Sequence, residues 1–271
     1  MSRIGDSFAR VRADGRALLV GYLPAGFPSY AGCIDALRAM VDGGVELIEV
    51  GFPYSDPVMD GPTIQAAAER ALAGGLRTHD VLRTVEAAAE LAPTVVMTYW
   101  NPIERYGVDE FARDLAAAGG SGLITPDLIP DEAAEWVAAS DEQGLDRIFL
   151  VSPSSTDRRI ALTARACRGF LYAASVMGVT GARAQPSRQA AALVGRVRAA
   201  TDLPVGLGLG VSNGAQAAEV AGYADAVIVG SAFVRRLLDA PDADMGVRAV
   251  EALAEDLAGG VRRELPAAPT G

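Results

Sequence analysis

The stretch that decides the fold reads Glu46-Leu-Ile-Glu-Val-Gly-Phe-Pro-Tyr-Ser-Asp-Pro-Val-Met-Asp-Gly-Pro-Thr-Ile-Gln65. Its first part, Leu47–Gly51, is a short apolar run typical of a buried strand in a parallel sheet. A loop punctuated by proline and glycine follows, and an amphipathic helix is expected to begin near Ile64. The stretch therefore predicts a strand, a long loop and a helix, with one carboxylate, Glu49, in the strand and a second, Asp60, in the loop.

The same alternation of a short apolar run and an amphipathic segment continues along the chain. Strands are expected at Leu18–Tyr22, Leu47–Gly51, Thr94–Thr98, Gly122–Thr125, Ile148–Val151, Phe170–Ala173, Val205–Gly208 and Ala226–Val229. Helices are expected at Ala31–Val41, Ile64–Ala73, Val81–Ala92, Asp109–Ala118, Glu132–Gln143, Arg158–Arg165, Gln189–Ala200 and Ala215–Ala221. Eight such units without a linker predict one closed (β/α)8 barrel, a TIM barrel, over residues 1–271. The alternative, an open doubly wound sheet, fits eight regular units less well.

Segments outside the eight units are expected to be additions to the barrel. A helix is predicted near Ser2–Arg12 and another near Met245–Glu264, so that the core covers about residues 17–264. Residues 265–271 are rich in proline and alanine and are expected to fray. The intervals after the second strand and over residues 175–188 are long. On the C-terminal face of a barrel such loops are either lids over a site or tolerated insertions.

The composition removes several kinds of chemistry. The 271 residues include no lysine, so all 24 basic residues are arginine, and His79, Cys33 and Cys167 are the only histidine and cysteines. A lysine Schiff base is excluded, and His79 resembles a surface residue at a helix start, to which we assign no role. Zinc sites built from four cysteines, or from two cysteines and two histidines, are impossible with this composition. If the chain is an enzyme without a cofactor, its catalytic groups must be carboxylates, tyrosines and backbone dipoles.

Charge and hydropathy limit the partners and the location of the chain. The formal net charge of −10 argues against binding to nucleic acid or to an anionic membrane surface. Apolar runs such as Ala17–Leu23 are shorter than the roughly 18 residues of a membrane span. Met1–Gly15 is too charged for the apolar part of a signal peptide, and the two distant cysteines are expected to be buried free thiols. A cytoplasmic protein is predicted.

Glycines after the last two expected strands indicate a phosphate site. Leu203-Pro-Val-Gly-Leu-Gly-Leu-Gly-Val-Ser212 includes Gly210, and Val227-Ile-Val-Gly-Ser-Ala-Phe-Val234 places Gly230 and Ser231 at the start of a short extra helix. Barrels commonly bind phosphate between these two loops, where glycine lets the backbone approach and the helix directs N–H groups at the anion. The glycine run alone would equally suit close helix–strand packing, but both strand ends together favour phosphate.

The two carboxylates have different expected environments. Strand alternation puts Glu49 on the same face as Leu47 and Gly51, near the C-terminal end of the strand, where inward polar residues of a barrel act on substrate. The alternative is a buried Glu paired with arginine, but the expected strands contain no arginine. Burial should raise the Glu49 pKa and make it a proton carrier. Asp60 alone would more readily be a cap of the following helix, and its long loop favours a functional role instead.

Tyr172 ends the sixth expected strand. A phenol at this place would donate a hydrogen bond to a carboxylate or to substrate, or it is simply a half-buried strand tyrosine. Both interpretations fit the sequence equally.

Taken together, these residues resemble the tryptophan synthase alpha chain family. The resemblance rests on motifs that occur in the family's order over about residues 17–234. They are Glu49-Val-Gly-Phe-Pro-Tyr-Ser-Asp-Pro-Val-Met-Asp60-Gly-Pro-Thr-Ile-Gln, Met97-Thr-Tyr-Trp-Asn-Pro102, Pro126-Asp-Leu-Ile-Pro130, Gly178-Val-Thr-Gly-Ala182, Gly206-Leu-Gly-Leu-Gly-Val-Ser212 and Val229-Gly-Ser-Ala232. The first motif is highly specific to the family, whereas the glycine motifs alone are not.

The resemblance implies a (β/α)8 lyase that cleaves indole-3-glycerol phosphate to indole and D-glyceraldehyde 3-phosphate without a cofactor. It implies the following roles: catalysis by Glu49 and Asp60, phosphate binding by Gly181, Gly210, Gly230 and Ser231, a lid that includes Thr180, and a substrate pocket lined by Tyr22, Met97 and Tyr172. Two departures from the family pattern, Phe27 and Tyr22, affect packing near the loop after the second strand and near the indole ring. Neither departure touches the two carboxylates.

The resemblance also implies a partner. The expected partner is a pyridoxal-phosphate β chain that receives indole in an αββα complex, with loop 52–60 and Asn101-Pro102 as candidate contacts. Three alternatives stay open at this point: a stand-alone indole-releasing lyase, a barrel isomerase or lyase for another phosphorylated sugar, and a non-catalytic phosphate-ligand sensor. The sensor is the least favoured, because it would not need both Glu49 and Asp60.

Overall fold

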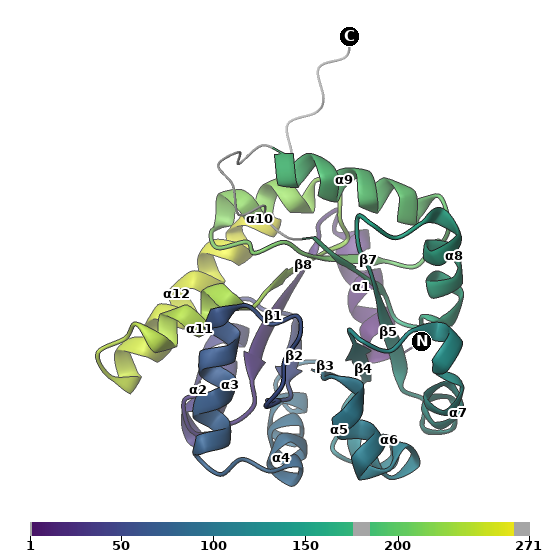
Figure 1. The fold of residues 1–271 in the computed structure, drawn as a ribbon. Helices are drawn as coiled ribbons and strands as arrows, with labels where there is room; N and C mark the ends of the chain where they lie inside the picture. The colour runs from purple at the N-terminus through teal and green to yellow at the C-terminus, as the bar shows by residue number, and fades with distance from the viewer. Residues whose placement is uncertain (1, 176–184, 263–271) are drawn as a thin grey trace.

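Eight parallel strands close into a barrel in the order β1 to β8, with β8 paired to β1. The computed structural model describes residues 2–175 and 185–262. The strands are β1 Leu18–Pro24, β2 Leu47–Gly51, β3 Thr94–Met97, β4 Gly122–Thr125, β5 Asp146–Val151, β6 Leu171–Ala174, β7 Val205–Gly208 and β8 Ala226–Val229. Figure 1 shows them at the centre, with the helices around them. The predicted (β/α)8 barrel is confirmed, and the open doubly wound alternative is wrong.

Helices follow the strands around the barrel. Those in the described residues are α1 Arg3–Ala13, α2 Tyr30–Asp42, α3 Pro62–Ala73, α4 Thr78–Ala89, α5 Trp100–Tyr106, α6 Val108–Ala117, α7 Ala134–Gln143, α8 Asp157–Ala166, α9 Gln185–Arg198, α10 Gly214–Ala221, α11 Ser231–Leu238 and α12 Ala243–Val261. The helices predicted near the two ends of the chain are present as α1 and α12, and the short helix after the last strand is α11. The helix α5 was not predicted. The tail 265–271 lies outside the described residues.

The inside of the barrel is filled by alternate strand residues. Leu18, Val20, Leu47, Val95, Ile124, Ile148, Phe170, Ala226 and Ile228 form this inner cluster with Ile4, Phe8 and Val11 of α1. The rings of Phe8 and Phe170 lie 5.6 Å apart. The intervening strand residues face outwards and pack against the surrounding helices. Because the apolar face of α1 closes one end of the barrel, a substrate must enter at the other end.

The remaining sequence expectations on the fold concern cysteines and membranes. Cys33 and Cys167 are both free and buried, as predicted. None of the helices in residues 2–175 and 185–262 combines the length and the apolar character that crossing a membrane requires.

Helices α10 and α12 approach each other at two glycines. A Cβ atom on Gly260 would lie 2.2 Å from the carbonyl oxygen of Gly214, and a Cβ on Gly214 would lie 2.3 Å from the carbonyl oxygen of Asp256. The Asp256 carboxylate also accepts a 2.7 Å hydrogen bond from the Gly214 backbone N–H. Backbone therefore contacts backbone at this crossing, and no flexible side chain can move aside to make room.

We expect Gly260→Ala to lower the free energy of unfolding by about 1–3 kcal/mol, the usual cost of overpacking. Gly259→Ala is the matched control, because a Cβ on Gly259 meets nothing within 4 Å. That variant should gain about 0.5–1 kcal/mol from helix propensity. Urea unfolding of both variants checks the pair, and equal effects on stability would contradict the close crossing.

Candidate active site

Glu49 lies at the third position of β2 and its side chain points into the barrel. The residue is 1% exposed, and its Oε2 atom has no hydrogen-bond partner among the described residues. Burial raises the pKa of Glu49 to about 8. A carboxyl group with this pKa carries its proton at neutral pH, so the structure supports the predicted proton-carrying state.

The alternative that Glu49 pairs with an arginine fails. The strand β5 begins at Asp146, two residues earlier than predicted, and it does contain an arginine, Arg147. The Arg147 guanidinium, however, donates to the Asp141 carboxylate and to the Ala166 carbonyl. Within residues 2–175 and 185–262 no ion pair involves Glu49, so its burial without a partner needs a functional explanation.

Asp60 lies at the end of the loop that follows β2 and is half-buried. The interpretation of Asp60 as a helix cap is wrong: α3 begins at Pro62, its N-cap residue is Gly61, and no side chain caps it. The Gln65 side chain instead donates a 2.7 Å hydrogen bond to the Asp60 carbonyl. Burial raises the Asp60 pKa, whereas a hydrogen bond from the Tyr99 hydroxyl acts in the opposite direction. The carboxylate is thus left to face the cavity described next.

One cavity of about 500 Å³ brings the predicted residues together at the open end of the barrel. Its lining includes the predicted residues Tyr22, Glu49, Asp60, Met97, Tyr172, Gly210, Gly230 and Ser231. Thr180 and Gly181 lie outside the described residues. Residues from several separate strand ends, far apart in the chain, therefore share one space.

The two tyrosines lie over glycines beside Glu49. A Cβ on Gly51 would lie 2.3 Å from the Tyr22 hydroxyl, and a Cβ on Gly208 would lie 2.5 Å from the Tyr172 hydroxyl. Only glycine leaves room for these phenols at the strand ends. Burial raises the pKa of both tyrosines well above the usual value, and the nearby Glu49 charge adds to this. Both phenols are therefore neutral hydrogen-bond donors.

The end of the cavity away from β2 has the features of an anion site. The helix α11 begins at Ser231, and its N-cap Gly230 provides no side-chain cap. The first N–H groups of a helix lack partners within the helix, so they are free to bind an anion here. Gly210 adopts φ +73°, a conformation that favours glycine. This arrangement agrees with the predicted phosphate site.

Comparisons with known proteins agree with this geometry. The pattern of the family described as "Tryptophan synthase alpha chain" matches residues 8–262. The tryptophan synthase alpha chain of Salinispora tropica is 65% identical over 98% of this chain and 100% of its own length, and that of Acidothermus cellulolyticus is 64% identical over 97% and 98%. A tryptophan synthase structure from Mycobacterium tuberculosis is 58% identical, covers 97% of this chain and 99% of its own, and has a TM-score of 0.90.

The chain belongs to the tryptophan synthase alpha chain family. As a member of this family it has the alpha-subunit role in tryptophan biosynthesis and the lyase activity of the alpha reaction. The two departures from the family pattern occupy separate places. Phe27 is fully buried in the layer outside the barrel, with the Arg70 guanidinium 5.8 Å from its ring centroid, whereas Tyr22 lines the cavity.

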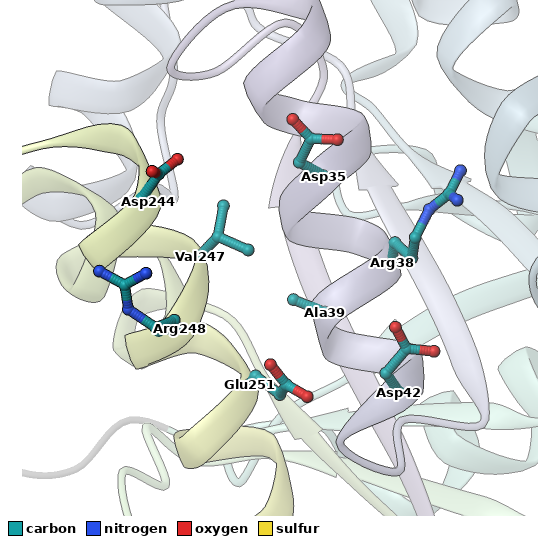
Figure 2. A pocket seen from close by; sticks show the side chains of 8 residues that line it. All are labelled: Asp35, Arg38, Ala39, Asp42, Asp244, Val247, Arg248 and Glu251. Atoms are coloured by element: carbon teal, nitrogen blue, oxygen red, sulfur yellow. The ribbon is translucent and has the colours of Figure 1, made fainter.

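A second hollow on this alpha-chain fold lies between α2 and α12. Figure 2 shows Asp35, Arg38, Ala39 and Asp42 on α2 facing Asp244, Val247, Arg248 and Glu251 on α12. Charged side chains dominate this surface groove, and it contains none of the residues predicted from the sequence. The cavity at the open end of the barrel is therefore the candidate active site.

Sequence reasoning missed part of the lining of this alpha-chain cavity. The additional residues are Met59, Gly61, Pro62, Thr63, Ile64, Ser175, Gly208, Leu209, Ile228 and Arg235. Most are neighbours of predicted residues along the chain. Arg235 had a readable signal, because it follows Ser231 by four residues on one helix and so shares its face.

Proposed function

We propose that this chain cleaves indole-3-glycerol phosphate to indole and D-glyceraldehyde 3-phosphate in the cavity at the open end of the barrel. The observation that carries the proposal is a buried, unpaired Glu49 that shares this cavity with Asp60 and with the glycine-lined N-terminus of α11. A proton carrier, a second carboxylate and an anion site are the three parts that this substrate requires.

Glu49 acts first as an acid. Direct cleavage of the bond between indole C3 and the side chain would expel an indole carbanion, which is a poor leaving group. A proton from Glu49 to C3 converts the ring to an indoleninium cation. The hydroxyl on the neighbouring carbon then returns its proton to Glu49, its oxygen forms the aldehyde carbonyl, and the electrons of the broken C–C bond neutralise the ring. The Glu49 pKa of about 8 suits both proton transfers.

Asp60 acts as a fixed negative charge. In the indoleninium the positive charge is concentrated at the ring N–H, and an ionised carboxylate beside this group stabilises the cation. Two carboxylates in unequal environments thereby take two roles: Glu49, fully buried, holds a proton, and Asp60, half-buried, remains charged. The protonated ring accepts the electrons, so the mechanism calls for no metal or coenzyme in this chain.

The proposed partner is a pyridoxal-phosphate β chain that receives indole in an αββα complex in the cytoplasm. Support comes from exposed apolar side chains near the mouth of the cavity. Val58 is 80% exposed and Met59 is 54% exposed on the loop after β2. On the same face the Asn101 side chain donates a 3.0 Å hydrogen bond to the Tyr54 hydroxyl. Two adjacent exposed apolar side chains at this place offer a partner protein an apolar contact beside the cavity.

The test of the proposal is cleavage of indole-3-glycerol phosphate by the purified chain, followed through the release of indole, with and without an added β chain. We expect indole from the chain alone and a large increase in rate on addition of the β chain. Release that the β chain does not change would favour a stand-alone lyase. Absence of indole under both conditions would refute the proposed reaction.

The rate of cleavage should depend on pH through Glu49. Its pKa is raised by burial, so the acid form is present below about pH 8 and is lost as the pH rises through this value. We therefore expect kcat/KM to fall about tenfold for each pH unit above 8 and to show no loss near pH 4.5 to 7 from this group. Initial rates from pH 6 to 10 check this, and a profile that stays flat to pH 10 would contradict it.

A further inference from the structure

Arg235 is the only cationic side chain among the described residues that line the cavity. The same cavity contains two carboxylates, Glu49 and Asp60, and the chain as a whole has a formal net charge of −10. Glu49 carries its proton at neutral pH, so Asp60 is the charged carboxylate of the two. A phosphorylated substrate adds about two negative charges to that of Asp60, whereas a helix N-terminus provides the equivalent of only about half a positive charge. The full positive charge of Arg235 on the wall offsets part of this negative charge and so favours binding of the phosphate group.

The position of Arg235 directs its guanidinium to the phosphate end of the cavity. It lies four residues after Ser231 on α11, and helical side chains lean towards the N-terminus of their helix. A smaller hollow that borders the cavity is also lined by Gly210, Ser231 and Arg235. Arg235 thus shares a wall with two of the predicted phosphate-binding residues in both spaces.

Most N–H donors of the Arg235 guanidinium have no partner among the described residues. Its Nη2 atom donates a 3.3 Å hydrogen bond to the Thr63 hydroxyl, near the start of α3. Among residues 2–175 and 185–262 this is the only hydrogen bond of its side chain, and it forms no ion pair there. Arginine has five N–H donors in a planar fork that matches a phosphate group, so most of them remain available to a ligand.

We infer that Arg235 is a substrate-binding residue that recognises the phosphate group and so selects phosphorylated substrates. This inference rests on the proposed function and deepens it. The Thr63 bond holds the guanidinium at the junction of α3 and α11, between the loop that carries Asp60 and the helix that begins at Ser231. Charge-assisted hydrogen bonds from this side chain complement the backbone N–H groups of α11.

The reverse reaction separates this role from a structural one, because only one of its two substrates carries phosphate. We expect Arg235→Gln to raise the KM for D-glyceraldehyde 3-phosphate about tenfold, the loss expected for one charge-assisted hydrogen bond at an exposed position. The KM for indole and kcat should stay within about twofold. Arg235→Lys keeps the charge and should recover most of the affinity.

Arg248→Gln is the matched control. Arg248 is also an exposed arginine, but it lies on α12 in the groove facing α2 and lines neither the cavity nor the smaller hollow that borders it. The same loss of charge there should change every constant by less than about twofold. Equal KM values for the aldehyde in Arg235→Gln and Arg248→Gln would overturn the inference, as would a rise in the KM for indole in Arg235→Gln as large as that for the aldehyde.

Calorimetric titration measures binding in a way that does not depend on catalysis. The ligands are inorganic phosphate and D-glyceraldehyde 3-phosphate, each added without indole. Weaker binding of both to Arg235→Gln than to the unchanged chain supports the inference even if cleavage of indole-3-glycerol phosphate is not observed. Equal binding by the two proteins overturns the inference and leaves the proposed cleavage standing.

Discussion

Glu49→Gln is expected to lower the rate of indole-3-glycerol phosphate cleavage by about 10²–10⁴-fold, the usual contribution of a general acid–base group. Glutamine keeps the shape of the protonated side chain but cannot give a proton to indole C3 or take one from the hydroxyl. The loss should appear in kcat, because the phosphate end of the cavity is unchanged. Single-turnover measurement of indole release checks this, and near-normal turnover would remove Glu49 from the mechanism.

The same variant provides its own control for folding. Below pH 4.5 the Glu49 carboxyl is protonated in both the folded and the unfolded chain. Between pH 4.5 and about 8 the unfolded chain ionises while the folded chain keeps the proton, so each pH unit lowers the stability of the folded form by about 1.4 kcal/mol.

Above about pH 8 the stability cost of Glu49 is complete and on the order of 5 kcal/mol. Glu49→Gln lacks this cost, because its amide does not ionise. It should match the unchanged chain at pH 4 and exceed it in unfolding free energy at pH 9. Loss of activity in a protein that is more stable at alkaline pH could not come from unfolding. Equal stability at both pH values would contradict the burial of an unpaired Glu49.

Asp60→Asn should lower kcat for the same cleavage by about 10²-fold. The change keeps the size of the side chain and removes the negative charge that stabilises the indoleninium cation. The effect should be smaller than that of Glu49→Gln, because Asp60 is only half-buried and water screens part of its charge. Steady-state rates measured with the isolated chain check this, because binding of a β chain then cannot affect the rate.

The control for Asp60→Asn is Asp35→Asn, which makes the same charge change in the exposed groove between α2 and α12. It should leave kcat and KM within about twofold. If both variants lose activity equally, the loss reflects net charge rather than a carboxylate at the substrate. If Asp60→Asn keeps full activity, the indoleninium needs no charge from this loop.

Much of the fold could be predicted because its signals are local. Each predicted strand overlaps an observed one, since strands of a parallel barrel are buried on both faces and read as apolar runs. The missed features lack such a signal. The helix α5 has seven residues, too few for a clear amphipathic period, and β5 begins with charged residues. Asp146 is tolerated there because the Ser2 hydroxyl donates a 2.5 Å hydrogen bond to it.

The sequence by itself determined the barrel, the inward direction of Glu49 and the glycines of the loops after the last two strands. Strand alternation and the need for glycine at close approaches are properties of neighbouring residues, so they can be read without a structure. The exclusion of a lysine Schiff base, and of zinc sites built from four cysteines or from two cysteines and two histidines, followed in the same way from composition alone.

Only the tertiary structure decided the roles open to Asp60 and Arg235. As a local pattern, Asp60 before Gly61 and Pro62 is more readily interpreted as a helix cap, and the fold shows that Gly61 takes that place. The Arg235 side chain donates a hydrogen bond to Thr63, which lies 172 positions away in the sequence. Contacts of this kind depend on how distant helices pack around the closed barrel. The neighbouring residues in the chain therefore carry no pattern from which the burial or the charge balance of such a contact could be predicted.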